Sequence, residues 1–402
     1  MKKTNVIKNK NIILIILLVV IAGSIYYLNS QKAGPSDFEP VEQLKQTEDV
    51  VDIEKQIEGI PKAAFSEYIK DDKAIKQKSM LYQEAPELRG IEGYINTDSD
   101  IKIQSLKGKV VLVDFWTYTC INCIRTFPYL KSWDEKYRGD GLVIIGVHTP
   151  EFEFEKKYEN VKSAVEKYEL KYPTVQDNNY ATWRAYKNRF WPHKYLIDID
   201  GFIRYDHIGE GGYEETEQVI LELLNEKMER EGQGKIEEDM AKPSDVVDVE
   251  YRKIGTPEIY LGYGFARGNF GNKEGLQPNQ IIDYKIPLIV KPNKVYLEGK
   301  WKVNKDDSEL ISEEGRIVLG YNAKVVNVVV GSDTGSEVEV FVDTNTLDES
   351  KIGADVKIID DKSIATIKEE RLYNLVDYEY GPGLLELRIK GKGFKINAFT
   401  FG

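Results

Sequence analysis

The arrangement of apolar residues predicts a region of mixed α/β structure in the middle of the chain. Residues 109–115 and 142–147 are short, mostly apolar runs rich in β-branched side chains, which is typical of strands buried on both faces. Apolar and polar residues recur at helical spacing in three further segments. The predicted helices cover residues 121–137, 152–168 and 214–230.

A hairpin follows later in the same region. Residues 194–198 and 202–205 flank Ile199-Asp200-Gly201, which has the composition of a turn between two antiparallel strands. The order of elements is therefore strand, helix, strand, helix, hairpin and helix. Such an order predicts an α/β domain in which a parallel pair of strands precedes an antiparallel pair.

The pattern changes beyond about residue 250, where short alternating runs are separated by clusters of Gly, Asp, Asn and Pro. This pattern is typical of an all-β sandwich. The predicted strands are 295–297, 316–319, 325–330, 338–342, 384–389 and 394–401.

The amino-terminal segment predicts attachment to a membrane. Lysines precede a charge-free, mostly apolar run at 12–25 that continues to Leu28, and a run of this length is at the short end of what crosses a bilayer. Lysine-rich flanks stay in the cytoplasm, so the rest of the chain is expected outside it, after a single span. A cleaved signal peptide, with Ala22-Gly23-Ser24 as its cleavage site, is the alternative.

These patterns divide the chain into consecutive parts. The 402 residues exceed what one core usually serves, so two folded domains are expected. The predicted parts are a cytoplasmic segment (1–10), an anchor (11–28), a stalk or disordered spacer (29–80), the α/β domain (81–232), a linker (233–250) and the β-sandwich (251–402).

Charge and cysteine content narrow the function. A net charge of −12 argues against a nucleic-acid partner, because a phosphate backbone requires clustered Lys and Arg. The chain has two cysteines, three positions apart, and three histidines. A disulfide framework would need more cysteines, and a four-ligand zinc site would need further Cys or His nearby. We therefore expect neither a metal nor a cofactor.

Cys120-Ile121-Asn122-Cys123 follows a predicted buried strand and opens a predicted helix. At a helix amino terminus, free backbone N–H groups and the helix dipole favour the thiolate of Cys120. The thiolate is the species that attacks a disulfide. Cys123 lies one turn further on, so it can attack the mixed disulfide and release the product. A CxxC pair in this context predicts thiol–disulfide exchange.

The sequence around the cysteines resembles the thioredoxin superfamily. Residues 113–123, which include Trp116-Thr117-Tyr118-Thr119-Cys120-Ile121-Asn122-Cys123, resemble its active-site segment, and 125–130 resemble the TlpA/ResA-like branch. The resemblance extends over residues 85–402 and is strongest to the carboxy-terminal region of DipZ proteins. Further similar segments are 146–152, 189–192, 256–262, 295–301 and 398–402. It implies a thioredoxin-like domain followed by a jelly-roll sandwich similar to carbohydrate-binding modules.

The resemblance implies roles for three residues that face the substrate. Cys120 matches the nucleophile and Cys123 the resolving thiol. Pro192 matches the cis-proline that lies opposite the disulfide, where exposed backbone groups can pair with a substrate peptide. The alternative for Pro192 is an ordinary trans turn proline.

Three more residues are implied by the same resemblance. Asp114 matches a buried acid whose pKa burial should raise, so that it accepts the proton of Cys123; alternatively it is a strand-end acid hydrogen-bonded to backbone. Trp116 would shield the disulfide or simply fill the core. Glu151 would supply the acidic position near the site.

The predicted function is reduction or isomerisation of disulfides in protein substrates. The Ile121-Asn122 spacer lacks the histidine of strong oxidants, and this absence favours a reductant or isomerase. With a single predicted span, electrons must come from a separate protein, and the resemblance implies a membrane donor of the CcdA/DsbD type.

Two other functions remain as alternatives. In a peroxiredoxin-like peroxidase, a proline stands where this chain has Val113, although Thr117 fits the pattern. In a cell-wall or glycan-binding scaffold, Tyr260, Tyr263 and Trp301, together with Tyr321, would stack on sugars. The alternative for these aromatic residues is packing in the core of the sandwich.

Overall fold

The computed structural model describes residues 73–97, 100–237 and 239–402. The predicted cytoplasmic segment, the anchor and most of the stalk lie outside these residues. In the described part, no helix is both long and apolar enough to cross a membrane. Residues 73–81, at the end of the predicted stalk, are helical, and Ile75–Gly402 form one compact unit.

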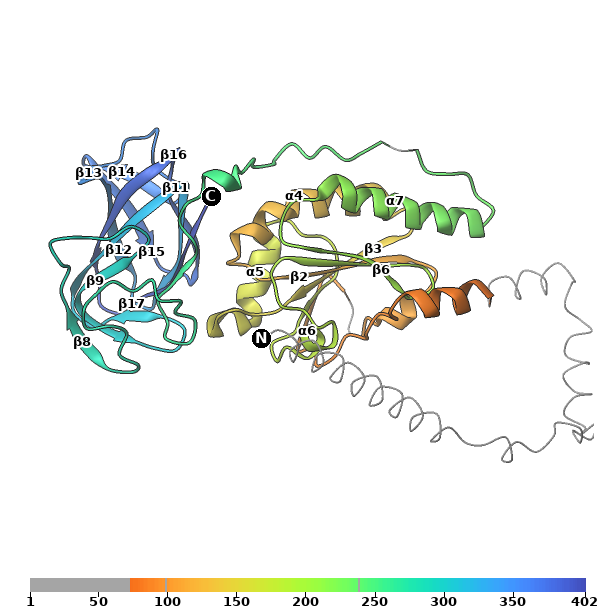
Figure 1. Ribbon diagram of the computed structural model, residues 1–402, viewed down its shortest axis with the longest axis horizontal. Helices are drawn as coiled ribbons and strands as arrows, with labels where there is room; N and C mark the ends of the chain where they lie inside the picture. The colour runs from red at the N-terminus through yellow and green to blue at the C-terminus, as the bar shows by residue number, and fades with distance from the viewer. Residues whose placement is uncertain (1–72, 98–99, 238) are drawn as a thin grey trace, which may run out of the picture. The chain divides into compact units, whose positions relative to one another are not determined.

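The α/β domain contains a six-stranded sheet in the order β1-β4-β3-β2-β5-β6 (Figure 1). Its strands are β1 (Gly93–Ile95), β2 (Val110–Trp116), β3 (Leu142–His148), β4 (Thr174–Gln176), β5 (His193–Ile197) and β6 (Ile203–Ile208). Its helices are η2 (Ile103–Leu106), α4 (Ile121–Tyr137), η3 (Glu153–Lys156), α5 (Tyr158–Lys167), α6 (Ala181–Ala185) and α7 (Tyr213–Arg230). Strands β2, β3 and β4 are parallel, whereas β5 and β6 form the antiparallel hairpin. The predicted α/β class is therefore confirmed.

Helices cover both faces of this sheet. Because side chains alternate along a strand, Leu112 and Trp116 of β2 pack beneath α4, α5 and α7, whereas Val113 and Phe115 pack toward α6 on the opposite face. Figure 1 shows α4 and α7 together on one face and α6 on the other. The alternation places Asp114 on the face covered by α4.

One predicted helix is wrong in part. Residues 152–168 form two helices, η3 and α5, separated by Lys157 in an extended conformation. The buried carboxylate of Glu155 accepts the backbone N–H groups of Glu151 and Phe152 and so caps the amino terminus of η3. The short helix then ends at Lys157, which is also the N-cap residue of α5.

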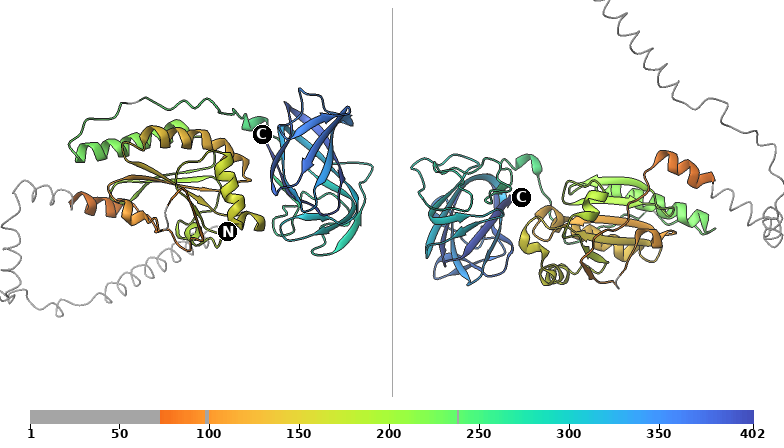
Figure 2. Two further views of the ribbon diagram at one scale, coloured as in Figure 1. Left: turned by 180° about the vertical axis from the view of Figure 1, so that it is seen from behind. Right: turned by 90° about the horizontal axis from the view of Figure 1, so that it is seen from below.

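The carboxy-terminal region is β-rich, as predicted. Its elements are η4 (Tyr251–Lys253), β7 (Ile259–Tyr260), β8 (Ile281–Tyr284), β9 (Val295–Val303), β10 (Ser308–Leu310), β11 (Glu314–Ser332), β12 (Ser336–Val342), β13 (Asn345–Thr346), β14 (Val356–Ile359), β15 (Lys362–Ile367), β16 (Arg371–Lys390) and β17 (Phe394–Phe401). Hydrogen bonds join these strands into one 11-stranded network, which Figure 2 shows from two further directions.

Strand β11 corrects the predicted division at residues 316–319 and 325–330. It runs continuously through both segments, with an irregularity between Ala323 and Val325 where the register against β16 shifts. The residues between the two apolar runs therefore belong to the strand, and the irregularity at Lys324 is a bulge rather than a turn.

The four aromatic residues considered for sugar stacking differ in exposure. Tyr260, Trp301 and Tyr321 are buried, and Trp301 lies in the core against Phe394. Tyr263 is 37% exposed. Packing thus accounts for three of the four rings.

Candidate active site

The two cysteines lie where β2 gives way to helix α4. Cys120 is the N-cap residue of α4, and its Sγ accepts a hydrogen bond from the backbone N–H of Cys123 at 3.2 Å. Cys120 is partly exposed, whereas Cys123 is 1% exposed, and both are free thiols. An accessible sulfur therefore stands in front of a shielded one on the same helical turn.

The environment of Cys123 disfavours its thiolate. Burial, followed by the hydrogen bond to Cys120 and the nearby charges of Cys120 and Asp114, raises the pKa of Cys123 well above its usual value. A nucleophilic role for Cys123 would therefore require a nearby proton acceptor.

Asp114 is a buried acid near enough to Cys123 to raise the pKa of its thiol. It is 1% exposed, and its Oδ1 has no hydrogen-bond partner among the described residues. Burial raises the pKa of Asp114 to about 7, although the positive charge of Lys194 opposes the rise. An acid with this pKa can both accept and release a proton near neutrality.

Lys194 is a site residue that the sequence did not reveal. It lies directly opposite Asp114 in the antiparallel pairing of β2 and β5. Its side chain is fully buried, and Nζ donates to the carbonyl oxygen of Gly209 at 3.2 Å. Burial lowers the pKa of Lys194, whereas Asp114 and then Cys123 raise it. The sequence does contain one indication of its importance, because Lys194 is a charged residue within a mostly apolar strand, two residues after Pro192.

Pro192 and Trp116 are two further residues that the resemblance placed at the site. The Trp191–Pro192 peptide bond is cis, as the resemblance implied. Trp116 is fully buried and packs edge-on against Phe127 and His148, with ring centroids 5.3 and 5.0 Å away. Trp116 shares the apolar cluster of Cys123, so it contributes to the buried core in which this thiol lies.

Glu151 does not contact the cysteine turn itself. Its Oε1 accepts a hydrogen bond from the hydroxyl of Tyr260 at 2.8 Å. The acid that binds the turn is Glu155, which the sequence did not indicate: its Oε1 accepts the hydroxyl of Thr119 at 2.5 Å. Glu155 is fully buried, and Thr119 directly precedes Cys120.

Thr117 and Tyr118 also have partners outside the turn. Thr117 Oγ1 lies 3.3 Å from His148 Nε2, and burial lowers the pKa of His148 to about 3, so this ring is neutral. The hydroxyl of Tyr118 donates to the carbonyl oxygen of Glu370 at 3.3 Å. Each residue from Thr117 to Thr119 is therefore held by a side-chain contact.

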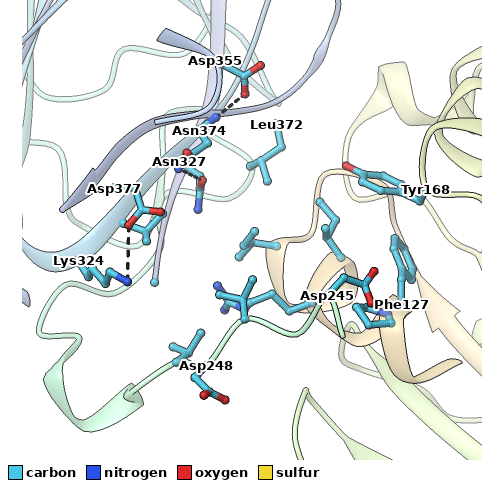
Figure 3. A pocket seen from close by; sticks show the side chains of 18 of the residues that line it. Phe127, Tyr168, Asp245, Asp248, Lys324, Asn327, Asp355, Leu372, Asn374 and Asp377 are labelled. Atoms are coloured by element: carbon cyan, nitrogen blue, oxygen red, sulfur yellow. Dashed lines mark hydrogen bonds and ion pairs between the residues drawn. The ribbon is translucent and has the colours of Figure 1, made fainter. Parts of the chain in front are cut away.

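A cavity of about 440 Å³ opens beside helix α4. Apolar side chains of Ile121, Ile124 and Leu372 line it, together with Tyr168. Figure 3 shows Tyr168 on one side of the cavity and the ion pair of Lys324 with Asp377 on the other, with 3.7 Å between Nζ and Oδ1. One of the residues that line the cavity, Ile121, directly follows Cys120 in the chain.

A second polar cluster lies on the α/β domain. Asp198, Asp200 and Glu226 have carboxylate oxygens within 4.8 Å of one another. Lys78 Nζ binds all three, 2.8 Å from Asp198 and 2.5 Å from Asp200. Arg204 also contacts Asp198 and Glu226. The carboxylates are thus neutralised by cationic side chains.

Family models match two parts of the chain. Residues 82–206 match the AhpC/TSA family, and residues 256–402 match a family described as a thioredoxin-like C-terminal domain. The two matches correspond to the α/β domain and the β-rich domain.

Relatives of the chain include DipZ proteins and thiol–disulfide oxidoreductases. The chain is 39% identical to DipZ of Mycobacterium bovis over 251 residues, which are 61% of this chain and 35% of DipZ. It is 32% identical to the thiol–disulfide oxidoreductase ResA of Bacillus cereus over 153 residues, which are 37% of this chain and 82% of ResA. A solved oxidised thioredoxin-like protein is 27% identical over 36% of this chain and 97% of its own, with a TM-score of 0.34. The chain spans about a third of the DipZ proteins it matches.

Proposed function

The chain belongs to the ResA-like thiol–disulfide oxidoreductases of the thioredoxin superfamily, close to DipZ. On this premise, we propose that Cys120 and Cys123 exchange disulfides with protein substrates outside the cytoplasm. The observation that carries the proposal is the position of the two sulfurs. Cys120 is partly exposed at the start of α4, and Cys123 is shielded one turn behind it. Nucleophile and resolving thiol need this order of access.

The reaction proceeds in two exchanges. The Cys120 thiolate attacks one sulfur of the substrate disulfide, forming a Cys120–substrate disulfide and releasing the other substrate sulfur as a thiolate. Cys123 then loses its proton to Asp114, attacks Cys120 Sγ and releases the second substrate sulfur. The substrate gains two electrons, and the protein is left with a Cys120–Cys123 disulfide. A dithiol donor must reduce that disulfide before the next turnover.

The surroundings of the cysteines suit a protein substrate. The cavity beside α4 begins at Ile121 and offers apolar surface to side chains that flank the substrate disulfide. Its apolar lining and charged rim match the usual composition of a site that binds part of a polypeptide.

The location and the electron donor are further parts of the proposal. Four lysines followed by the apolar run at 12–25 support an anchored chain with its catalytic part outside the cytoplasm. A membrane protein of the CcdA/DsbD type would then deliver electrons to Cys120–Cys123. Protease treatment of intact cells tests the location: the folded part should be digested without lysis, and its survival would contradict the proposed topology.

The exchange activity is tested with the full chain and a disulfide-bonded protein such as insulin. Wild type should reduce it in the presence of a dithiol, Cys120→Ser should abolish turnover, and Cys123→Ala should accumulate a mixed disulfide. Cys123→Ala treated with a reductant is the matched control, because the trapped species should then disappear. Absence of turnover by folded wild type would refute the proposal. Consumption of hydrogen peroxide at a comparable rate would favour the peroxidase alternative.

A further inference from the structure

The turn that carries Cys120 is held by contacts that lead into the β-rich domain. Thr119 donates its hydroxyl to Glu155 at 2.5 Å, and Tyr118 donates its hydroxyl to the carbonyl oxygen of Glu370, which directly precedes β16. Asn160 of α5 also donates to the Tyr118 hydroxyl at 3.3 Å. Tyr118 thus connects the turn directly to structure beyond the α/β domain, whereas Thr119 is bound to Glu155 within it.

Glu155 and Glu151 form the centre of the first connection. Glu155 accepts three hydrogen bonds: the Thr119 hydroxyl on Oε1 and the backbone N–H groups of Glu151 and Phe152 on Oε2, at 2.6 and 2.9 Å. Burial raises the pKa of Glu155, and these donors oppose the rise because they favour the charged form. Of the two acids, Glu155 has more donors to stabilise its charge.

Glu151 is the member that carries a proton at neutral pH. Burial, and then the charge of Glu155, raise the pKa of Glu151 to about 8, and the hydrogen bond from Tyr260 opposes this rise. The other groups that face its carboxylate are Glu258 and Arg267, and the hydroxyl of Tyr180 lies nearby.

Tyr260 joins this acid pair to the β-rich domain. It lies in β7, paired with Ala398 of β17. Its hydroxyl donates to Glu151 at 2.8 Å, and its ring packs near Phe152, with centroids 6.3 Å apart. Tyr260 and Ala398 belong to the same buried cluster as Cys123. The position of the Tyr260 hydroxyl is thus fixed by the sheet.

We propose that the β-rich domain contributes directly to the redox site. In this proposal Tyr260 acts through Glu151 and Glu155 as a positioning residue for the turn that carries Cys120. This inference rests on the proposed exchange activity. With a proton on Glu151, Glu155 keeps its charge and holds Thr119. When Glu151 loses the proton, two carboxylates face each other in a buried site, and their repulsion acts on the contact with Thr119.

The proposal fixes the direction of change in each variant. The equilibrium of the Cys120–Cys123 couple with glutathione should show an inflection near pH 8 in wild type, from Glu151. Tyr260→Phe removes a donor to the charged form of Glu151, so this inflection should move to higher pH. Glu151→Gln removes the titrating group, so the inflection should disappear.

Tyr284→Phe is the matched control. Tyr284 is a fully buried tyrosine of β8 whose hydroxyl donates to the carbonyl oxygen of Gly275, within the β-rich domain. It should keep the wild-type profile, whereas Tyr260→Phe should change the equilibrium constant with glutathione at least threefold between pH 7 and pH 9 relative to wild type.

The outcomes separate this inference from the proposed function. If wild type exchanges disulfides but Tyr260→Phe and Glu151→Gln keep its pH profile, the positioning role is refuted and the function stands. If both tyrosine variants shift alike, loss of a buried hydroxyl explains the effect and the positioning role is also refuted. If folded wild type does not exchange disulfides at all, the proposed function itself fails.

Discussion

Replacing Asp114 with asparagine should make the protein more stable at alkaline pH and slower in catalysis. The charged form of Asp114 is unfavourable in the fold, because the side chain is 1% exposed and Oδ1 has no partner in the described part of the chain. Asparagine has nearly the same shape and cannot ionise. It therefore resembles the protonated acid at every pH.

The magnitude follows from the shift in pKa. Burial raises the pKa of Asp114 from 3.8 to about 7. Between these two pH values, the folded protein keeps a proton on Asp114 that the unfolded chain has already lost. Wild type thus loses stability from this residue as pH rises from about 4 to about 7, and nothing further above that. Three pKa units correspond to at most about 4 kcal/mol. The variant should gain up to this amount relative to wild type at pH 8, and almost nothing at pH 4.

Urea unfolding of both proteins at pH 4.5 and pH 8 measures this difference. Tryptophan fluorescence is a suitable signal because four of the five tryptophans, at positions 116, 133, 183 and 191, lie in the α/β domain. In turnover, the variant should resolve the mixed disulfide about 100-fold more slowly, the usual loss when a general base is removed. An equal effect of Asp114→Asn on stability at both pH values would refute the assignment of a buried, proton-bearing Asp114.

Three other changes test neighbouring parts of the structure. Asp200→Asn should have the opposite pH dependence, because burial raises the pKa of Asp200 but hydrogen bonds from Arg230 and Lys78 lower it overall. The Asp200 carboxylate therefore stabilises the fold above the pKa of the unfolded chain, and this stabilisation disappears as pH falls. Urea unfolding of the variant should show a loss of stability at pH 7 and little change at pH 3. Lys194→Met removes the charge that opposes the raised pKa of Asp114, and the pH midpoint of mixed-disulfide resolution in stopped-flow assays should therefore increase; an unchanged midpoint would contradict the influence of Lys194. Trp301→Ala should cost about 3–5 kcal/mol in urea unfolding, since this fully buried ring packs in the β-rich core; a loss below 1 kcal/mol would contradict its burial.

Local sequence was sufficient to predict the parts of the site that lie close together in the chain. The bounds of α4, Ile121–Tyr137, and of β17, Phe394–Phe401, agree with the predicted segments. The two cysteines are three positions apart in the chain, so their relation is set by a single turn. Strands β1 and β4 were missed because each has only three residues, too few to show a periodic pattern.

The rest of the site depends on contacts between distant segments. Lys194 meets Asp114 through the register of two strands 80 positions apart in sequence, and Tyr260 reaches Glu151 from another domain. Strand register depends on the whole pattern of buried side chains, and side-chain contacts between domains depend on how both are folded. No motif in one segment predicts either pair.

The two faces of the α/β sheet show why Asp114 differs from an ordinary buried polar residue. On the face toward α6, His193 is also buried, but its ring nitrogens contact Asn188 at 2.7 Å and Asp206 at 2.9 Å. A polar group satisfied in this way contributes to a stable core. Asp114, on the face of the cysteines, has an oxygen without a partner and a lysine opposite. A fold selected only for stability would replace both by apolar residues. An acid that can exchange a proton would explain why both are present, and the thiol of Cys123, whose pKa the charge of Asp114 raises, is the group that the proposed mechanism requires to give up a proton.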